Sequence, residues 1–205
     1  MPLARFEKLQ PSKRARLIEV ATAEFAARGF SDASLNEILA ASGLGKSSYY
    51  YYFVDKEDLF ATVVNELYRS LTSVVPPPKI DAKSANAFWQ AIEEWHLGWL
   101  KAIVQRPHAM RIVRAAQTLR RSRSVNESVA FAQLSEMVRD VIREGQARGF
   151  VRKDLAADVL VDLVEAADGA LDAALFAEHD DPSPARLRAH TRLALDTTRR
   201  LLSPA

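Results

Sequence analysis

The sequence has no cysteine among its 205 residues, which excludes a disulfide framework, thiolate zinc sites and cysteine nucleophiles. No uncharged apolar run reaches the ~18 residues of a transmembrane helix, so we expect no membrane partner. The 28 Lys and Arg nearly balance the 26 Asp and Glu, and the net charge of +2 identifies no partner. The first ten residues lack the apolar stretch of a signal peptide, and we expect a cytoplasmic protein.

Helical periodicity runs through the whole sequence. Apolar residues recur with a period of about 3.6 from Leu17 to Leu202, and only seven glycines interrupt them. The expected helix caps are Ser12, Ser34, Asp55, Ser124, Asp154 and Ser183, and the expected glycine ends are Gly29, Gly43 and Gly149. The sequence therefore predicts an all-α fold of about nine helices, with a break at residues 76–78, which are three consecutive prolines.

Residues 34–53 have the pattern of two short helices joined by a tight turn. Ser34 and Glu37 have capping-box spacing, and Gly43 stands where the chain must reverse sharply. Small polar residues, Lys46 to Ser48, then open the second helix. Such residues let the start of a recognition helix enter the major groove and offer donors to base edges.

Four consecutive tyrosines, residues 49–52, continue this second helix. Successive helical positions point about 100° apart, so a helix cannot bury all four. We expect Tyr49 to be buried and at least two of the others to be exposed. Exposed aromatic rings close to Lys46 and Lys56 favour nucleic-acid binding, although residues 1–60 hold eight basic and eight acidic side chains. Binding would then depend on individually placed charges and on dimerisation.

The stretch from Arg16 to Leu59, RLIEVATAEFAARGFSDASLNEILAASGLGKSSYYYYFVDKEDL, resembles the DNA-binding module of TetR-family transcriptional repressors. The resemblance implies an N-terminal helix-turn-helix DNA-binding domain at residues 1–55 and a larger helical ligand-binding and dimerisation domain at residues 56–205. It also implies a homodimer that binds a palindromic double-stranded DNA operator and is released by a small-molecule inducer. Its site residues would be Asn36, Lys46 and Ser47 for base contacts, and Ser34, Ser48, Tyr50, Tyr52 and Lys56 for phosphate contacts.

The predicted helix at 81–104 contains all three tryptophans of the protein. Its aromatic residues spread over two adjoining faces, which is more than one core-facing stripe needs. The alternatives are an unusually aromatic core and a ligand pocket. Because the resemblance implies an inducer pocket in this region, we expect its walls to include Trp89, Trp95, His96, Trp99, Met110 and Phe131.

Neither catalytic nor metal chemistry has a supporting pattern. Glu93 and His96 have the Glu-x-x-His spacing of a di-iron bundle, but no second such motif exists. We therefore predict that the protein is not an enzyme and has no metal site and no cofactor. The alternative function is an all-helical small-molecule-binding protein, or an enzyme, whose N-terminal module has lost DNA binding.

Charge is segregated in the C-terminal part of the sequence. Residues 101–123 hold seven basic side chains and no acid, and residues 154–181 hold nine acids and no base. Asp158, Asp162, Glu165 and Asp172 would share one helical face. One interpretation is that this face is solvated or pairs with opposite charges on neighbouring helices. The alternative is that it lines a ligand site and favours ligands of one charge. The opposite face and the last helix predict a dimer interface that includes Leu163, Ala167, Ala170, Leu171, Leu195 and Leu202.

Overall fold

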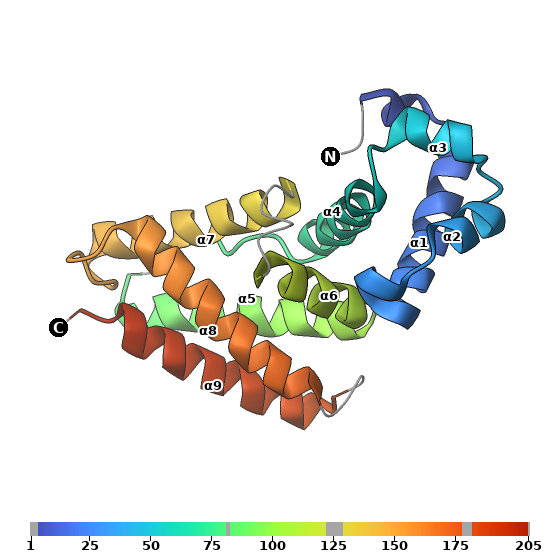
Figure 1. Ribbon diagram of the computed structural model, residues 1–205. Coiled ribbons are helices and arrows are strands. Elements are labelled where there is room, and N and C mark those ends of the chain that lie inside the picture. Colours follow the sequence, from blue (N-terminus) through green and yellow to red (C-terminus); the bar gives the residue numbers. More distant parts are fainter. Residues whose placement is uncertain (1–3, 81–82, 122–128, 178–181, 205) are drawn as a thin grey trace. The chain divides into compact units, whose positions relative to one another are not determined.

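The computed structural model describes residues 4–80, 83–121, 129–177 and 182–204 (Figure 1). Over these residues the chain is helical and forms no strand, which confirms the all-α prediction. The elements are η1 (Ala4–Lys8), a 3-10 helix, and the α-helices α1 (Pro11–Asp32), α2 (Leu35–Ser42), α3 (Lys46–Tyr52), α4 (Lys56–Val74), α5 (Ala85–Val104), α6 (Ala109–Arg121), α7 (Val129–Arg148), α8 (Ala157–Ala177) and α9 (Pro184–Leu202).

Most of the predicted helix ends are confirmed. Ser34 and Ser183 accept hydrogen bonds from amides three residues later, and the Asp55 carboxylate accepts one from the amide of Asp58 at 2.8 Å. Gly43 and Gly149 end their helices with positive φ angles of 70° and 77°. The predicted cap at Ser124 lies outside the described residues.

Three of the predicted helix ends need correction. The first helix begins at Pro11, not after Ser12, because proline fits the first turn of a helix. It continues to Asp32 beyond a kink at Gly29, where φ is 73°. Asp154 does not cap α8, since its carboxylate accepts two hydrogen bonds from the guanidinium of Arg152 and the helix begins only at Ala157.

The chain divides into two compact units. Unit 1 comprises Met1–Ser70 and Arg106–Ala132, and unit 2 comprises Leu71–Gln105 and Gln133–Ala205. The predicted domains, 1–55 and 56–205, divide the chain by function and stay a prediction. No described helix combines the length and the apolar composition needed to cross a bilayer.

Unit 1 has an aromatic core between α1 and α4. The buried rings of Phe25 and Phe60 pack edge to face with their centroids 5.0 Å apart, and Phe30 contacts Phe60 at 5.4 Å. Helix α6, from the basic segment of the sequence, packs against α1 in this unit. These contacts give the short α2 and α3 helices a scaffold within unit 1.

Unit 2 is built around α5, α8 and α9. Helix α9 packs against both α5 and α8, and α8 and α9 run antiparallel in Figure 1. Gly145 of α7 stands where a Cβ atom would lie 2.5 Å from Val151 and 2.8 Å from Phe88, so the helix can approach these side chains only without a Cβ. The main buried cluster contains Phe88, Trp89, Ile142, Val151, Leu160, Val161, Val164 and Leu202.

Candidate functional site

The turn between α2 and α3 is fixed by local hydrogen bonds. The hydroxyl of Ser34 accepts from the amide of Glu37 at 3.3 Å. The second half of the expected capping box is replaced, because the amide of Ser34 donates to the carboxylate of Glu24 on α1 at 2.9 Å. At the other end of α2, Gly43 adopts the left-handed conformation that a residue with a Cβ atom reaches only under strain. The sequence motif thus folds into helix, glycine turn and helix.

Two aromatic side chains hold α3 against unit 1. Tyr49 and Phe53 are fully buried, with ring centroids 5.2 Å apart. The Tyr49 hydroxyl donates to the carbonyl oxygen of Asp55 at 2.5 Å. Burial, together with the charges of Asp55 and Asp58, raises the pKa of Tyr49 well above its usual value. The expectation that Tyr49 is buried is confirmed, and its hydroxyl stays protonated and hydrogen-bonded.

The opposite side of α3 is exposed. Tyr50 and Tyr51 are each 50% exposed, as expected for at least two of the tyrosines. No side-chain hydrogen bond caps the start of the helix at Gly45. The predicted contact residues that lie exposed on α2 and at α3 are Asn36, Lys46, Ser47, Ser48 and Tyr50. Helix α3 thus has a buried aromatic side and an exposed side of polar and aromatic residues.

Three other predicted phosphate-contact residues have structural partners. Ser34 uses its hydroxyl as the α2 cap, and half-buried Tyr52 packs against Phe6. Lys56 donates from Nζ to the carbonyl oxygens of Ser31 and Ala33, at 2.9 and 3.0 Å. These two hydrogen bonds occupy two of its three N–H donors. The role of these residues at phosphate stays a prediction, and Lys56 also ties α4 to the end of α1.

The N-terminal segment before α1 contributes to this region in a way that the sequence did not indicate. Phe6 of η1 is buried and packs on Phe53, with centroids 4.8 Å apart. Arg5 places its guanidinium 4.4 Å from the ring centroid of Tyr51. A hydrophobic residue five positions before Pro11 was the available signal. Arg5 is thereby held beside α3.

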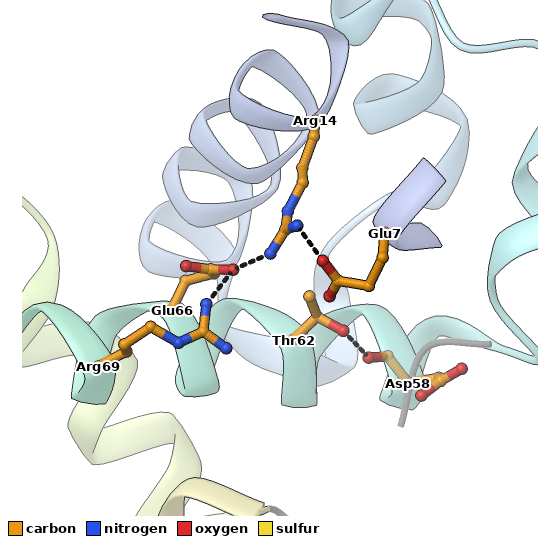
Figure 2. Close-up of polar contacts among 6 residues, drawn as sticks. All are labelled: Glu7, Arg14, Asp58, Thr62, Glu66 and Arg69. Atoms are coloured by element: carbon orange, nitrogen blue, oxygen red, sulfur yellow. Dashed lines mark hydrogen bonds and ion pairs between the residues drawn. The ribbon is translucent and has the colours of Figure 1, made fainter. Parts of the chain in front are cut away.

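A chain of ion pairs fixes η1 to α1 and α4 within unit 1. Figure 2 shows Arg14 between Glu7 and Glu66, with N–O distances of 2.5 and 2.7 Å. Arg69 pairs with the same Glu66 oxygen at 2.8 Å. Burial alone would raise the pKa of Glu66, but the hydrogen bonds from Arg14 and Arg69 outweigh it and lower this pKa. The network therefore ties η1, α1 and α4 together through ionised side chains.

The residues predicted to line a ligand pocket do not share one structural environment. Trp89 is buried in the core cluster of unit 2, as the alternative of an aromatic core requires for that residue. Trp95, His96 and Trp99 lie farther along α5, and the Trp95 and Trp99 rings contact each other edge to face at 6.3 Å. Met110 belongs to unit 1, and the side chain of Phe131 lies outside the described part. A common pocket stays a prediction.

Polar side chains gather between α5, α8 and α9 of unit 2. Nε2 of His190 and Oδ1 of Asp172 are 2.8 Å apart, and the rings of His96 and His190 stack at 6.0 Å. Burial raises the pKa of Asp168 to about 7, with the charge of Asp172 as a further cause, and burial lowers the pKa of His96. This pairing could not be predicted from sequence spacing, because Asp172 and His190 lie 18 positions apart on different helices.

The acidic face of α8 is matched by residues on neighbouring helices. Asp158 accepts a hydrogen bond from Nε of Arg139 at 2.6 Å, and Glu165 accepts one from the Ser135 hydroxyl. Of these contacts, the pair of Asp158 and Arg139 joins opposite charges on two helices, whereas Glu165 and Asp172 have hydrogen-bonding partners in Ser135 and His190. Asp162 lies exposed to solvent.

The predicted dimer face is partly available on the single chain. Leu163 of α8 is 39% exposed and Leu193 of α9 is 54% exposed. Ala170 is exposed, and Ala167, Leu171 and Leu195 are half-buried. Leu202 instead fills the core of its own unit, so an interface would form without it.

Unit 2 also has an open depression at the end of α7. It is lined by Arg143, Gln146, Ala147, Lys153, Asp154, Leu155 and Ala156. None of the residues predicted for ligand binding belongs to its lining.

Comparison with known proteins agrees with the helix-turn-helix geometry. Residues 17–63, from α1 into α4, match the model of "Bacterial regulatory proteins, tetR family". The uncharacterised transcriptional regulator YdgC of Bacillus subtilis is 40% identical over 55 residues, which are 27% of this chain and 28% of YdgC. The repressor DhaR of Mycobacterium sp. strain GP1 is 29% identical over 160 residues, which are 74% of this chain and 76% of DhaR.

Solved structures show that the likeness in fold extends beyond this module. The structure of SmeT, the repressor of a Stenotrophomonas maltophilia multidrug efflux pump, aligns with a TM-score of 0.66 at 16% identity and covers 93% of this chain and 90% of SmeT. At this identity the likeness concerns the fold alone. In sequence and in the helix-turn-helix geometry of α2 and α3, residues 17–63 are thus similar to the module described by the tetR family model of bacterial regulatory proteins.

Proposed function

We propose that this protein is a homodimeric transcriptional repressor that binds a palindromic DNA operator through α3 and is released by a small-molecule inducer. The observation that carries the proposal is the two-sided α3 helix. Tyr49 and Phe53 anchor it, while Lys46, Ser47 and Tyr50 face solvent. NicS of Pseudomonas putida, 25% identical over 145 residues, and DhaR are both described as repressors, which supports this direction of regulation.

Each exposed side chain has a chemically defined role in this proposal. Lys46 donates to guanine, Asn36 pairs with adenine through its amide, and Ser47 contacts a base edge. Ser48, Tyr50 and the third N–H of Lys56 donate to phosphates and set the position of the module without reading sequence. Two copies related by a two-fold axis would place their α3 helices in successive major grooves, about 34–36 Å apart.

The proposal places the inducer in the helical bundle, beside the tryptophans of α5. An inducer lowers operator affinity only by the difference between its affinities for the released and DNA-bound states. A small molecule that binds the bundle with equal affinity in the presence and absence of operator would contradict this part of the proposal.

The direct test is selection of bound sequences from random double-stranded DNA by the purified full chain at fixed, moderate salt. We expect an enriched inverted repeat whose bases match donors at Asn36, Lys46 and Ser47. Absence of enrichment, with a folded dimer shown by light scattering, would overturn the proposal in favour of an all-helical small-molecule-binding protein without DNA function.

The dimer is proposed to form through the exposed leucines of α8 and α9. Leu163→Glu combined with Leu193→Glu would place charges of one sign on both copies of this face. We expect the dimer dissociation constant to rise at least about 100-fold, because like charges in an interface cost several kcal/mol. Size-exclusion chromatography with light scattering measures the change.

Ala147→Glu, at an exposed position of α7, is the matched control and should leave the dimer intact. If the double variant stayed folded and dimeric at the same concentrations as the unmodified protein, the proposed interface would be wrong.

A further inference from the structure

The buried polar cluster of unit 2 combines the donor set of a transition-metal site. His96 of α5, Asp172 of α8 and His190 of α9 each offer one ligand atom, and these atoms all lie within 4.8 Å of one another. We propose that these three side chains bind one divalent transition-metal ion of the Zn²⁺ class, with the remaining coordination position open. The proposal concerns metal binding by unit 2 and does not depend on operator binding.

The distances suit a metal after small side-chain movements. Metal–nitrogen and metal–oxygen bonds of about 2.0–2.2 Å place neighbouring ligand atoms of a tetrahedral site about 3.3 Å apart. Nε2 of His190 and Oδ1 of Asp172 are closer than this, at 2.8 Å, and would separate slightly as the metal replaces their hydrogen bond. The ligand atom of His96 lies within 4.8 Å of the other two ligand atoms, and these two distances would shorten when a metal binds. The ligands come from α9 and from α5 and α8, which both pack on α9.

One of the two histidines has an unused buried nitrogen. Nδ1 of His96 is shielded from solvent and has no hydrogen-bond partner, although a buried polar atom normally has one. A bound metal ion would give this buried nitrogen the partner that it lacks.

The charge of the cluster also favours a cation. Asp168 lies one turn before Asp172 on α8, and its Oδ1 is buried without a hydrogen-bond partner. Helix α8 contains no basic residue, and Asp172 instead pairs with His190 of α9. A buried charge is costly unless it is paired or bound to a metal, so a divalent cation would offset this cost. Two imidazoles and one carboxylate select zinc and its transition-metal neighbours over Mg²⁺ or Ca²⁺, which prefer oxygen ligands.

Co²⁺ titration of the tag-free full chain, after treatment with a chelator and dialysis, tests the proposal. Bound Co²⁺ has a visible absorption band that reports its coordination, and added Zn²⁺ should displace it. We expect one Co²⁺ per chain. Asp172→Asn and, separately, His96→Gln should weaken binding at least about 100-fold and remove the band, because each deletes one of three ligands.

His108→Asn and Asp196→Asn are the matched controls. His108 and Asp196 are exposed, and asparagine tolerates the positive φ of 66° at position 108. Both should bind Co²⁺ like the unmodified protein. Circular dichroism without metal establishes that each variant is folded, and two independent ligand variants guard against one that misfolds. Stoichiometric binding lost only in the ligand variants would support the site; no binding by the unmodified protein, or equal binding by folded ligand variants, would overturn it.

Discussion

Replacing both Lys46 and Tyr50 with alanine is expected to weaken binding to the selected operator by about 1000-fold. Both side chains are exposed at α3, where the Tyr50 ring packs edge to face on Tyr49 of the same helix at 5.2 Å. A DNA contact of this kind contributes on the order of 1 kcal/mol, and a dimer loses four of them, or about 4 kcal/mol in total. Fluorescence anisotropy with labelled operator at one salt concentration measures the loss.

The single variants separate the two proposed roles. Lys46→Ala should relax sequence preference at one position of each half-site, whereas Tyr50→Ala should lower affinity for all sequences about equally. Lys79→Ala combined with Lys153→Ala, which removes two exposed lysines of unit 2, is the control and should bind like the unmodified protein. Operator affinity within about tenfold of normal in the folded K46A/Y50A dimer would contradict the assignment of α3 as the DNA-contacting helix.

Phe53→Ala is expected to be the most destabilising single substitution in the α3 region. The Phe53 ring is fully buried and packs on both Phe6 and Tyr49, so its removal leaves a cavity beneath the helix. Phe→Ala changes at such positions cost about 3–5 kcal/mol of the free energy of unfolding. Urea denaturation followed by far-ultraviolet circular dichroism measures this cost.

Tyr51→Ala removes a neighbouring aromatic ring that is half exposed, and it should cost less than about 1 kcal/mol. Equal unfolding midpoints for the two variants would show that the Phe53 contacts do not anchor α3. We expect F53A also to weaken operator binding, because it removes the anchor and leaves the exposed contact residues unchanged.

Local patterns in the sequence were sufficient for the helix-turn-helix. Ser34 as a cap, Gly43 in the left-handed conformation and the burial of Tyr49 each depend on a few neighbouring residues, so sequence spacing predicts them. Ser12 and Asp154 failed as caps for a related reason. Pro11 starts the first helix one residue before Ser12, and the guanidinium of Arg152 binds the Asp154 carboxylate. Sequence spacing alone does not show which of two such neighbouring interactions forms.

Contacts between distant segments were beyond the sequence patterns. The pairing of Arg14 with Glu66 and the meeting of His96 with His190 join positions 52 and 94 residues apart, and no periodicity relates them. Leu202 shows the same limit: its position on an apolar stripe indicates burial but does not distinguish the core of the chain from a dimer interface. The candidate DNA contacts could be predicted because they lie within one short motif, whereas the polar cluster of unit 2 required the fold.

The most direct test of the central claim compares the selected inverted repeat with the same DNA lengthened by five base pairs at its centre. Five base pairs are about half a helical turn, so the second half-site rotates to the opposite side of the duplex. A homodimer that places two α3 helices in successive major grooves should then bind no more tightly than it binds a single half-site. Unchanged affinity after the insertion would contradict two-fold recognition through α3.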